Sequence, residues 1–425
     1  MTASPTAARD TQADVLISGG GLVGQMLALS LAHHGLTSIV VDPANPATVL
    51  APEFDGRASA IASGPWKMME AIGLGPALQD HGCPIERIWV SDGLKPGELD
   101  FAAKPEDGPL GIMFENRRMR LAFTAACAAH DLIDYRAPVT TASIERGPHG
   151  VTLALTDGSV LSAPLIAVCE GRRSPTRDAA GITLARWSYG HGAMIGAFAH
   201  EAAHENVAYE IFYPEGPFAI LPLNDLAGAD DDRLQGSRWR HRSAFVWSSH
   251  ESISPTYLKL GPRGYRAEVL KKMGGILGDI EEIAPRGLFP LTYQRAGAIV
   301  ADRMVLVGDS AHGIHPIAGQ GFNLGLRDVA TLVEVLVDGA RLGLDLGDAH
   351  LLERYGRWRG LDNLSVAAAT DGLVHLFGIP GKAASAVRRL GLAGVQRADL
   401  LKSFFMAEAR GETGDVPKLL AGVEI

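Results

Sequence analysis

The fold of this chain is decided by residues 15–42, which read VLISGGGLVGQMLALSLAHHGLTSIVVD. Residues 14–18 form a short apolar run typical of a buried strand, and residues 38–42 form a second run rich in β-branched side chains. Between them, Leu22–His34 has the apolar spacing of a helix, which Gly35 ends as a C-cap residue. The order strand–helix–strand predicts a parallel βαβ unit and therefore an α/β fold.

The turn before this helix has the glycine pattern Gly19-x-Gly21-x-x-Gly24. The first glycine permits the tight turn, the second lets the backbone approach a pyrophosphate, and the third allows close helix–strand packing. The N–H groups at the start of the helix, around Leu22 and Val23, offer partial positive charge to phosphates. A glycine-rich turn without a ligand is the alternative, and the complete set of flanking elements argues against it.

Asp42 ends the second strand, at the separation from the glycine turn that suits a carboxylate binding a ribose hydroxyl. An acidic group at this place disfavours a 2′-phosphate. The dinucleotide is therefore expected to be FAD or NAD, not NADP, and this segment alone does not choose between the two.

A second glycine-rich segment lies far along the chain, where residues 303–326 read RMVLVGDSAHGIHPIAGQGFNLGL. Its apolar strand, residues 303–307, brings Gly308 and Asp309 to a strand end, where a carboxylate can accept a hydrogen bond from a sugar-alcohol chain. The following loop contains Pro316 and leads to a helix that begins around Gly321.

The start of that second helix favours FAD over NAD. A helix N-terminus acts as about half a positive charge and stabilises the negative charge of a reduced flavin ring by about 1 kcal/mol. NAD has no such requirement. We expect Pro316, Gly319 and Gln320 to lie near the ring, with chemistry carried by the flavin and no certain catalytic side chain.

His312 and His315 raise the question of a metal site. They lie in a Gly/Pro-containing loop without an HExxH pattern or a cysteine partner. We expect structural or cofactor-facing histidines and no metal.

Composition narrows the class of protein further. The chain has 425 residues, 47% of them apolar, and a net charge of −9, which argues against nucleic acid as a partner. Its three scattered cysteines fit a reducing compartment, so we expect a cytoplasmic protein. No apolar run approaches the roughly 18 residues that span a bilayer.

The remaining patterns predict how the chain is organised. Helical spacing recurs at Ala58–Ile72 and Asn116–His130, and buried or alternating strands are expected at residues 138–144, 151–155 and 165–169. From Tyr189 to Ser249 alternating segments dominate, which is typical of an antiparallel sheet. After Gly321 the pattern is almost wholly helical, with a long stretch from Leu351 to Leu376.

We therefore expect an FAD-binding βαβ (Rossmann-like) domain built from discontinuous segments, with an inserted antiparallel-sheet substrate domain and a helical C-terminal region. The expected boundaries are residues 1–79, 111–182 and 291–345 for the FAD-binding domain, 80–110 and 183–290 for the substrate domain, and 346–425 for the helical region.

Further motifs carry a resemblance to a known family. Residues 170–177 read EGRRSPTR, residues 55–57 read DGR, and residues 115–117 read ENR. Together with the two glycine segments, these motifs resemble the class A flavoprotein aromatic hydroxylases, whose fold type is para-hydroxybenzoate hydroxylase. The resemblance extends from Asp14 to about Gly411.

Three stretches resemble the ubiquinone-biosynthesis hydroxylases within that family. They are WSYG at residues 187–190, EGPFAILPL at residues 215–223 and DGLVHLF at residues 371–377. The chain departs from its relatives at Ile211, where Arg is usual, and at Glu170, where Asp is usual.

The resemblance implies a set of FAD-contacting residues. They are Gly19, Gly21, Leu22, Val23, Gly24, Asp42, Arg57, Asn116, Glu170, Gly308, Asp309, Pro316, Gly319, Gly321, Phe322 and Asn323.

The resemblance also implies a reaction. NAD(P)H, as a transient reductant, reduces FAD, dioxygen adds to the flavin, and one oxygen atom passes to an electron-rich phenolic ring. The expected substrate is an aromatic quinone precursor, and Ile211 in place of a cation favours a prenylated one. The pocket candidates are Ile211, Phe212, Phe218, Leu221 and Pro222, with ordinary sheet core or backbone shaping as the alternatives.

Two alternatives for function remain open. One is a monooxygenase acting on a soluble aromatic compound, and the other is a non-catalytic flavin-binding scaffold of a quinone-synthesis assembly. The amphipathic segment Ala398–Arg410 predicts either a core-packing helix or a dock for a membrane surface or for other quinone-biosynthesis proteins.

Overall fold

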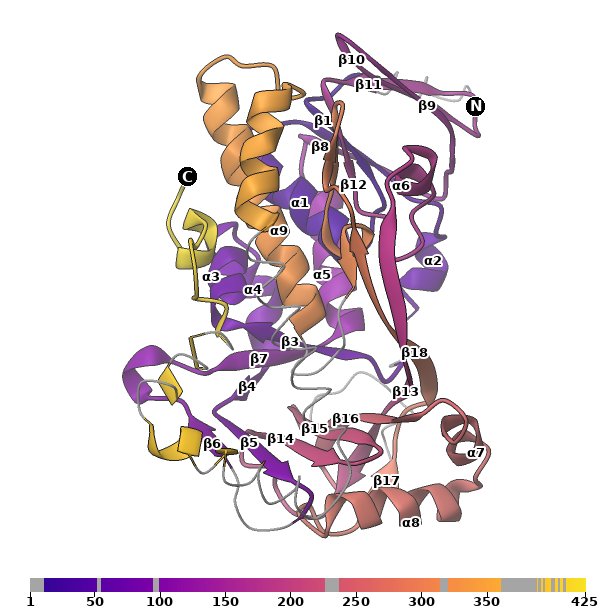
Figure 1. Ribbon diagram of the computed structural model, residues 1–425, viewed down its shortest axis with the longest axis vertical. Coiled ribbons are helices and arrows are strands. Elements are labelled where there is room, and N and C mark those ends of the chain that lie inside the picture. The colour runs from indigo at the N-terminus through magenta and orange to yellow at the C-terminus, as the bar shows by residue number, and fades with distance from the viewer. Residues whose placement is uncertain are drawn as a thin grey trace, which may run out of the picture.

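The computed structural model describes residues 11–51, 55–94, 99–225, 237–313 and 320–360, short stretches between Arg388 and Ala407, and residues 410–425. It has an upper part built on a parallel sheet and a lower part built on a larger, mostly antiparallel sheet (Figure 1). The α/β fold class expected from the sequence is confirmed.

The parallel sheet has the strand order β19-β20-β12-β1-β2-β8. Its central strand β1 (Val15–Ser18) pairs in parallel with β2 (Ser38–Val41) and with β12 (Leu165–Val168). The outer strands are β8 (Ile133–Arg136), β20 (Met304–Leu306) and β19 (Val300–Ala301), the last of which is antiparallel. One sheet is thus assembled from strands that are far apart in the sequence.

Both faces of this sheet are covered, which explains why β1, β2 and β12 are uniformly apolar. One face packs against α1 (Leu22–His33), α5 (Asn116–Ala128) and α9 (Gln320–Arg341). The other face packs against a small antiparallel sheet of β9 (Thr141–Gly147), β10 (Gly150–Leu155) and β11 (Val160–Ala163).

The larger sheet has the order β21-β18-β13-β16-β15-β14-β5-β6, with β17 beside β13. Its strands are β5 (Arg87–Asp92), β6 (Leu99–Ala102), β13 (Leu184–His200), β14 (Val207–Tyr213), β15 (Gly216–Leu223), β16 (His241–His250), β17 (Ile280–Glu282), β18 (Gly287–Ala296) and β21 (His312–Gly313). The expected antiparallel arrangement is confirmed, except that β14 and β5 run parallel.

Long strands join the two parts of the molecule. Strands β13 and β18 extend from the level of the parallel sheet down to α7 (Ser254–Leu258) and α8 (Pro262–Met273) (Figure 1). A three-stranded sheet of β3 (Ala58–Ala62), β7 (Gly111–Glu115) and β4 (Cys83–Ile85) lies between the two larger ones. The short helices are α2 (Pro46–Val49), α3 (Ser63–Ala71), α4 (Gly75–Leu78) and α6 (Pro175–Ala179).

The helix expected over Ala58–Ile72 was wrong in its first part. Residues 58–62 form β3, and the helix α3 begins only at Ser63. Small residues such as Ala and Ser decide little locally, so the antiparallel pairing of β3 with β7 determines the conformation. The side-chain amide of Asn323 adds bonds to this strand, donating to Ala60 O and accepting from Ala62 N.

The helical stretch expected from Leu351 is helical through residue 360. Its continuation, including the DGLVHLF motif, lies outside the described residues, as do Leu401, Phe404 and Phe405 of the amphipathic segment. In the part of the chain that the structure describes, no helix combines the length and the apolar character needed to cross a membrane.

Candidate cofactor and substrate site

The first glycine turn leaves open space only where a ligand has to approach. A Cβ atom on Gly24 would lie 1.9 Å from the carbonyl oxygen of Gly19, and one on Gly19, whose φ is +103°, would lie 2.5 Å from that of Cys169. A Cβ atom on Gly21 would meet nothing within 4 Å. Gly19 and Gly24 are therefore required by packing, and Gly21 borders unfilled space.

Helix α1 begins at this open position. Its N-cap is Gly21, and no side chain caps it. The first N–H groups of the helix, at Leu22 and Val23, are thus available to an anionic group, as expected for a phosphate site.

Asp42 holds the turn in place. One of its carboxylate oxygens accepts a hydrogen bond from Gly20 N at 2.5 Å, and the other accepts one from Ala44 N at 2.7 Å. Tyr135 donates to Gly20 O at 2.9 Å from the neighbouring strand β8. Asp42 lies at the C-terminal edge of β2, next to the turn. Its bond to a ribose stays a prediction.

The second glycine segment packs directly on the first. Cβ atoms on Gly308 and Gly325 would lie 3.3 Å and 3.1 Å from the side chain of Val23, which is in the first turn of α1. The N-terminal parts of α1 and α9 therefore lie close together. The expectation that both segments meet on one cofactor is compatible with this geometry.

A network of buried charged side chains holds the second glycine segment in place. Asp328 on α9 accepts hydrogen bonds from Gly308 N at 2.8 Å and from Arg359 Nε at 2.6 Å, and its carboxylate lies 2.6 Å from His312 Nε2. Burial by itself would raise the pKa of Asp328, but His312 and Arg359 outweigh it and hold that pKa below its ordinary value. His312 is thus part of the protein framework.

Asp328 and Arg359 were not predicted from the sequence. Asp328 is a charged residue in a largely apolar helical pattern, Arg359 lies in the polar stretch ERYGRWR at residues 353–359, and nothing in the sequence pairs one with the other. They are positioning residues, because they act on the cofactor segment through Gly308.

Glu170 is occupied by protein donors. Its carboxylate accepts hydrogen bonds from the hydroxyl groups of Ser18, Ser174 and Thr176 at 2.5–2.6 Å and from Thr176 N at 3.1 Å. It therefore ties the end of β1 to the start of α6. A contact of Glu170 with FAD stays a prediction.

The DGR motif lies just before β3, and the ENR motif lies where β7 ends and α5 begins; the two are joined by a hydrogen bond from Asn116 N to Arg57 O at 2.9 Å. Arg57 forms an exposed pair with Asp55, whose carboxylate also accepts from Arg120 at 3.3 Å. Asn116 accepts a hydrogen bond from Ser59 at 2.7 Å. These contacts leave the guanidinium of Arg57 partly exposed toward solvent.

The remaining flavin-loop candidates are only partly described. Pro316 and Gly319 lie outside the described residues, and so does the side chain of Gln320. Gly321 is in the first turn of α9, where a Cβ atom would meet nothing within 4 Å, and Phe322 packs at the edge of the main core. Asp309 follows Gly308 and lies 3.3 Å from Arg172 Nε.

The five pocket candidates do not share one face of the larger sheet. Ile211 is opposite Phe218, and this face packs against α8, where Phe218 is fully buried in a cluster with Trp247. Phe212 and Leu221 point to the other face, toward β3, β4 and β7. Pro222 is buried and follows Leu221 on the same strand, so its side chain lies on the opposite face from Leu221, the face that holds Ile211 and Phe218.

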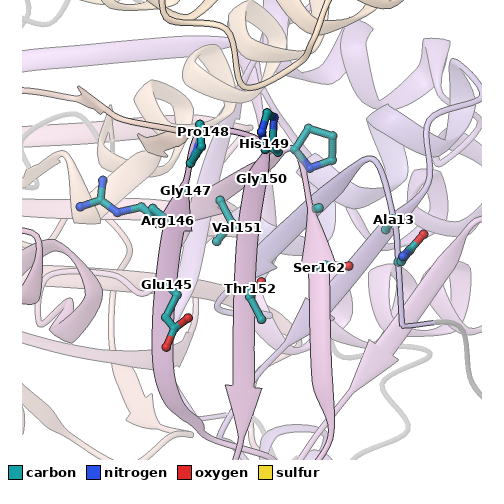
Figure 2. A pocket seen from close by; sticks show the side chains of 13 residues that line it. Ala13, Glu145, Arg146, Gly147, Pro148, His149, Gly150, Val151, Thr152 and Ser162 are labelled. Atoms are coloured by element: carbon teal, nitrogen blue, oxygen red, sulfur yellow. The ribbon is translucent and has the colours of Figure 1, made fainter.

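A hollow seen in Figure 2 lies away from all of these residues. It opens along the β9–β10 hairpin and the first described residues of the chain, and Glu145, Arg146 and His149 are its charged or titratable groups. None of the glycine segments lines it. We assign no role in cofactor binding to this hollow.

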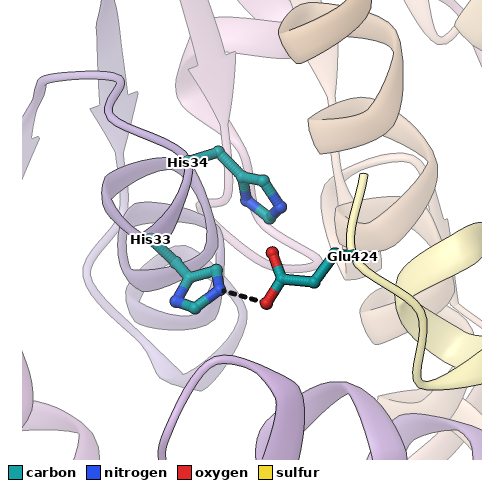
Figure 3. Close-up of side chains that lie close together, drawn as sticks. All are labelled: His33, His34 and Glu424. Carbon is teal, nitrogen blue, oxygen red and sulfur yellow. Dashed lines mark hydrogen bonds and ion pairs between the residues drawn. The ribbon is translucent and has the colours of Figure 1, made fainter.

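One surface group among the described residues has the ligand types of a metal site. His33, His34 and Glu424 lie together where the C-terminal segment meets α1 (Figure 3), and His33 Nε2 is 3.4 Å from a carboxylate oxygen of Glu424. His33 and Glu424 are exposed, and the group is distant in the fold from the glycine segments. Its evident role is to attach the C-terminal segment to α1.

FAD fits the residues present. An uncapped helix start at Gly21, a second helix start at Gln320–Gly321, and unfilled space beside both supply what a long anionic dinucleotide with a flavin ring requires.

Comparison with known proteins supports an FAD site. Residues 12–360 match a protein family described as an FAD binding domain. The chain therefore belongs to this family, and the expected class of FAD-dependent aromatic-ring hydroxylase is confirmed.

Individual relatives match along the full length. A ubiquinone hydroxylase, UbiL, of Rhodospirillum rubrum is 39% identical over 427 residues, covering 100% of this chain and 96% of that protein. The 3-demethoxyubiquinol 3-hydroxylase of Escherichia coli is 32% identical, covering 97% of this chain and 100% of that protein. Among solved structures, p-nitrophenol 4-monooxygenase PnpA of Pseudomonas putida superposes with a TM-score of 0.75 at 15% identity, covering 96% of this chain and 100% of that one, and supports the fold.

Proposed function

We propose that this enzyme hydroxylates a phenolic, polyprenylated intermediate of ubiquinone biosynthesis. The observation that carries the proposal is the match, over nearly the whole of both chains, to two proteins named as hydroxylases of ubiquinone or its precursors. The mostly apolar face around Leu221 is compatible with an apolar substrate.

FAD, when bound, supplies the oxygen-transfer chemistry, with NAD(P)H as the reductant and dioxygen as the oxygen source. We propose that it is held by the FAD-contacting residues that the family resemblance implies. The start of α1 binds phosphate, and Asp42 binds the ribose. The start of α9, fixed through Gly308 by Asp328, faces the ring.

The chain's own residues bind FAD, orient the substrate ring and shield the reaction from water. The part made of residues 1–79, 111–182 and 291–345 holds the cofactor, and the part made of residues 80–110 and 183–290 covers the reacting ring. Arg388, from the expected C-terminal region of residues 346–425, contacts the larger sheet through its ion pair with Asp92.

The test is substrate-stimulated NAD(P)H oxidation by the FAD-loaded protein, with the product identified by mass spectrometry. We expect a prenylated phenol to stimulate oxidation and gain one oxygen atom. The same ring without its prenyl chain is expected to be a poor substrate. Efficient hydroxylation of small soluble phenols alone would support the first alternative function, and no stimulation by any phenol would support a non-catalytic scaffold.

We further propose that the enzyme acts in the cytoplasm at the inner face of the membrane, because a polyprenylated substrate resides in lipid. Lys402, which belongs to the described part of the amphipathic segment, is half-buried. Flotation with anionic liposomes should recover the full chain and lose the variant that lacks residues 398–425. Equal flotation of both would remove membrane docking by this segment.

A further inference from the structure

Glu210 lies on an inner strand of the larger sheet, the third from the β6 edge. On β14 it is opposite Val90 of β5 on one side and Ala219 of β15 on the other. The same row continues through Val246 of β16 to Ile195 of β13. A carboxylate therefore stands in an otherwise apolar row that crosses five strands.

This row lies on the face turned away from α8. Side chains alternate along a strand, so Tyr209 and Tyr213 point to the α8 cluster and Glu210 points to the opposite face together with Ala208 and Phe212. This opposite face is the one that packs against β3, β4 and β7, the strands next to the cofactor segments.

Among the described residues, the row is only partly covered. Val90, Val246 and Ile195 are only half-buried, although their strands lie inside the sheet, and Glu210 is half-buried as well. The neighbouring side chains of β14 on the same face are buried. Ala208 belongs to the cluster with β4 and β7, and Phe212 packs against Leu392. Among the described residues, Glu210 is thus half-buried on a largely apolar part of this face.

Glu210 has no partner there. Among the residues that the structure describes, none donates a hydrogen bond to its carboxylate or forms an ion pair with it. Burial raises the pKa of Glu210 to about 7. A carboxylate that is desolvated without compensation is costly, and such groups concentrate at functional sites.

Other titratable groups on this face are already engaged or lie at its ends. Asp92 pairs with Arg388 at 2.9 Å, and Arg242 pairs with Glu115 at 2.9 Å. Burial raises the pKa of the Cys83 thiol to about 12, which keeps it protonated. Further titratable groups on the described part of this face include Glu281, opposite Ala199 on β17, and His191 and His250, at the far ends of β13 and β16.

We propose that Glu210 contacts the phenolic hydroxyl of the substrate and accepts its proton. This role rests on the proposed function and adds a residue to it. In the transfer the phenol O–H bond breaks, a carboxyl O–H bond forms on Glu210, and the electron pair stays on the phenolate oxygen. No oxidant or reductant enters this step.

The resulting phenolate ring is more electron-rich than the phenol and so is a better acceptor of oxygen. A phenol has a pKa of roughly 10. A base with a pKa near 7 is closer to that value than an ordinary glutamate with 4.5, so its burial makes the transfer easier.

The test compares Glu210→Gln with Glu215→Gln in the FAD-loaded enzyme. Glutamine keeps the shape of Glu210 and removes the charge, and Glu215 is an exposed carboxylate in the turn after the same strand. The probes are 2-geranylphenol and its methyl ether, which has no hydroxyl hydrogen. Their dissociation constants are read from the change in flavin absorbance between pH 6 and pH 8.

We expect the wild type and Glu215→Gln to prefer the phenol over the ether, with a preference that grows as pH rises through about 7. In Glu210→Gln the phenol should bind about tenfold more weakly, and the preference should lose its pH dependence. An infrared band of a protonated carboxyl group that disappears between pH 6 and pH 8 should be absent from Glu210→Gln alone.

The outcomes separate this proposal from the proposed function. Suppose that the wild-type enzyme hydroxylates the phenol. If Glu210→Gln then keeps the preference for the phenol over the ether, its pH dependence and the infrared band, the role of Glu210 is overturned and the proposed function stands. A wild-type enzyme that neither binds nor hydroxylates 2-geranylphenol would overturn both.

Discussion

At the scale of single residues, a fully buried carboxylate, Asp328, and a half-buried one, Glu210, are placed in opposite settings. Asp328 is compensated by His312, Arg359 and a backbone N–H group, so its charge is stable in the interior. Glu210 lacks such partners among the described residues. The first arrangement stabilises structure, and the second is available to a ligand.

Replacing Asp328 with Asn should destabilise the protein by about 3–5 kcal/mol, because the carboxylate charge that lies 2.6 Å from the fully buried Arg359 Nε is removed. Chemical denaturation measures this change in the free energy of unfolding. Asp338→Asn on the same helix is the control, since Asp338 pairs with Arg354 at the surface and should cost less than about 1 kcal/mol. Equal losses in the two variants would contradict the assignment.

The same residue predicts a pH dependence. Because the pKa of Asp328 is lower in the folded protein than in the unfolded chain, its contribution is fully present at neutral pH. That contribution is lost as pH falls below about 4, the unfolded value, toward the folded one. In Asp328→Asn the free energy of unfolding should therefore fall less steeply with acid than in the wild type.

At the scale of elements, the start of α1 separates packing from ligand binding. Gly24 has no room for a side chain because Gly19 O is 1.9 Å from the position of a Cβ atom, whereas Gly21 faces unfilled space. Two glycines in one turn thus serve different purposes.

Gly24→Ala should lower the stability of the FAD-free protein by several kcal/mol, since backbone would have to move. Gly21→Ala should leave that stability within about 1 kcal/mol and should still reduce FAD affinity at least tenfold, because the added methyl group occupies the space facing the ligand. Melting temperature and the FAD content after gel filtration distinguish the two. Normal FAD binding by Gly21→Ala would show that the ligand does not approach this glycine.

At the scale of the whole molecule, the cofactor site joins distant parts of the chain. Segments around Gly21 and Gly308 meet at Val23, and strands β13 and β18 connect them with the larger sheet (Figure 1). Binding at such a junction stabilises the entire fold.

The protein without FAD should therefore unfold at a lower temperature. When FAD is added back, the thermal midpoint should rise with the logarithm of the free FAD concentration. At a free FAD concentration of about 1,000 times its dissociation constant, the stabilisation should be about 4 kcal/mol. Calorimetry of the stripped protein with added FAD measures this effect, with AMP as a partial ligand for comparison. A midpoint that does not respond to FAD would contradict a site shared by both segments.

Much of the fold could be predicted from the sequence where patterns are local. The βαβ unit at residues 15–42, the helix at Asn116 and the helix at Gln320 follow from apolar spacing and glycine positions. Prediction was wrong at Ala58–Ala62, where small residues carry little intrinsic preference and strand pairing decides. Strands β5, β6 and β18 were not predicted. The partner of β18 is the distant strand β13, whereas β5 and β6 are neighbours in the chain and pair with each other.

Local sequence was enough to define the type of cofactor site, because glycine spacing and a strand-end carboxylate follow directly from how a backbone approaches phosphate. Which charges are compensated became visible only in the folded molecule. Asp328 and Arg359 meet across two elements, and Glu210 has no hydrogen-bond or ion-pair partner among the described residues. The solvation of a charged side chain and its ion pairs depend on neighbours that folding brings together. These neighbours cannot be read from the linear order of the residues.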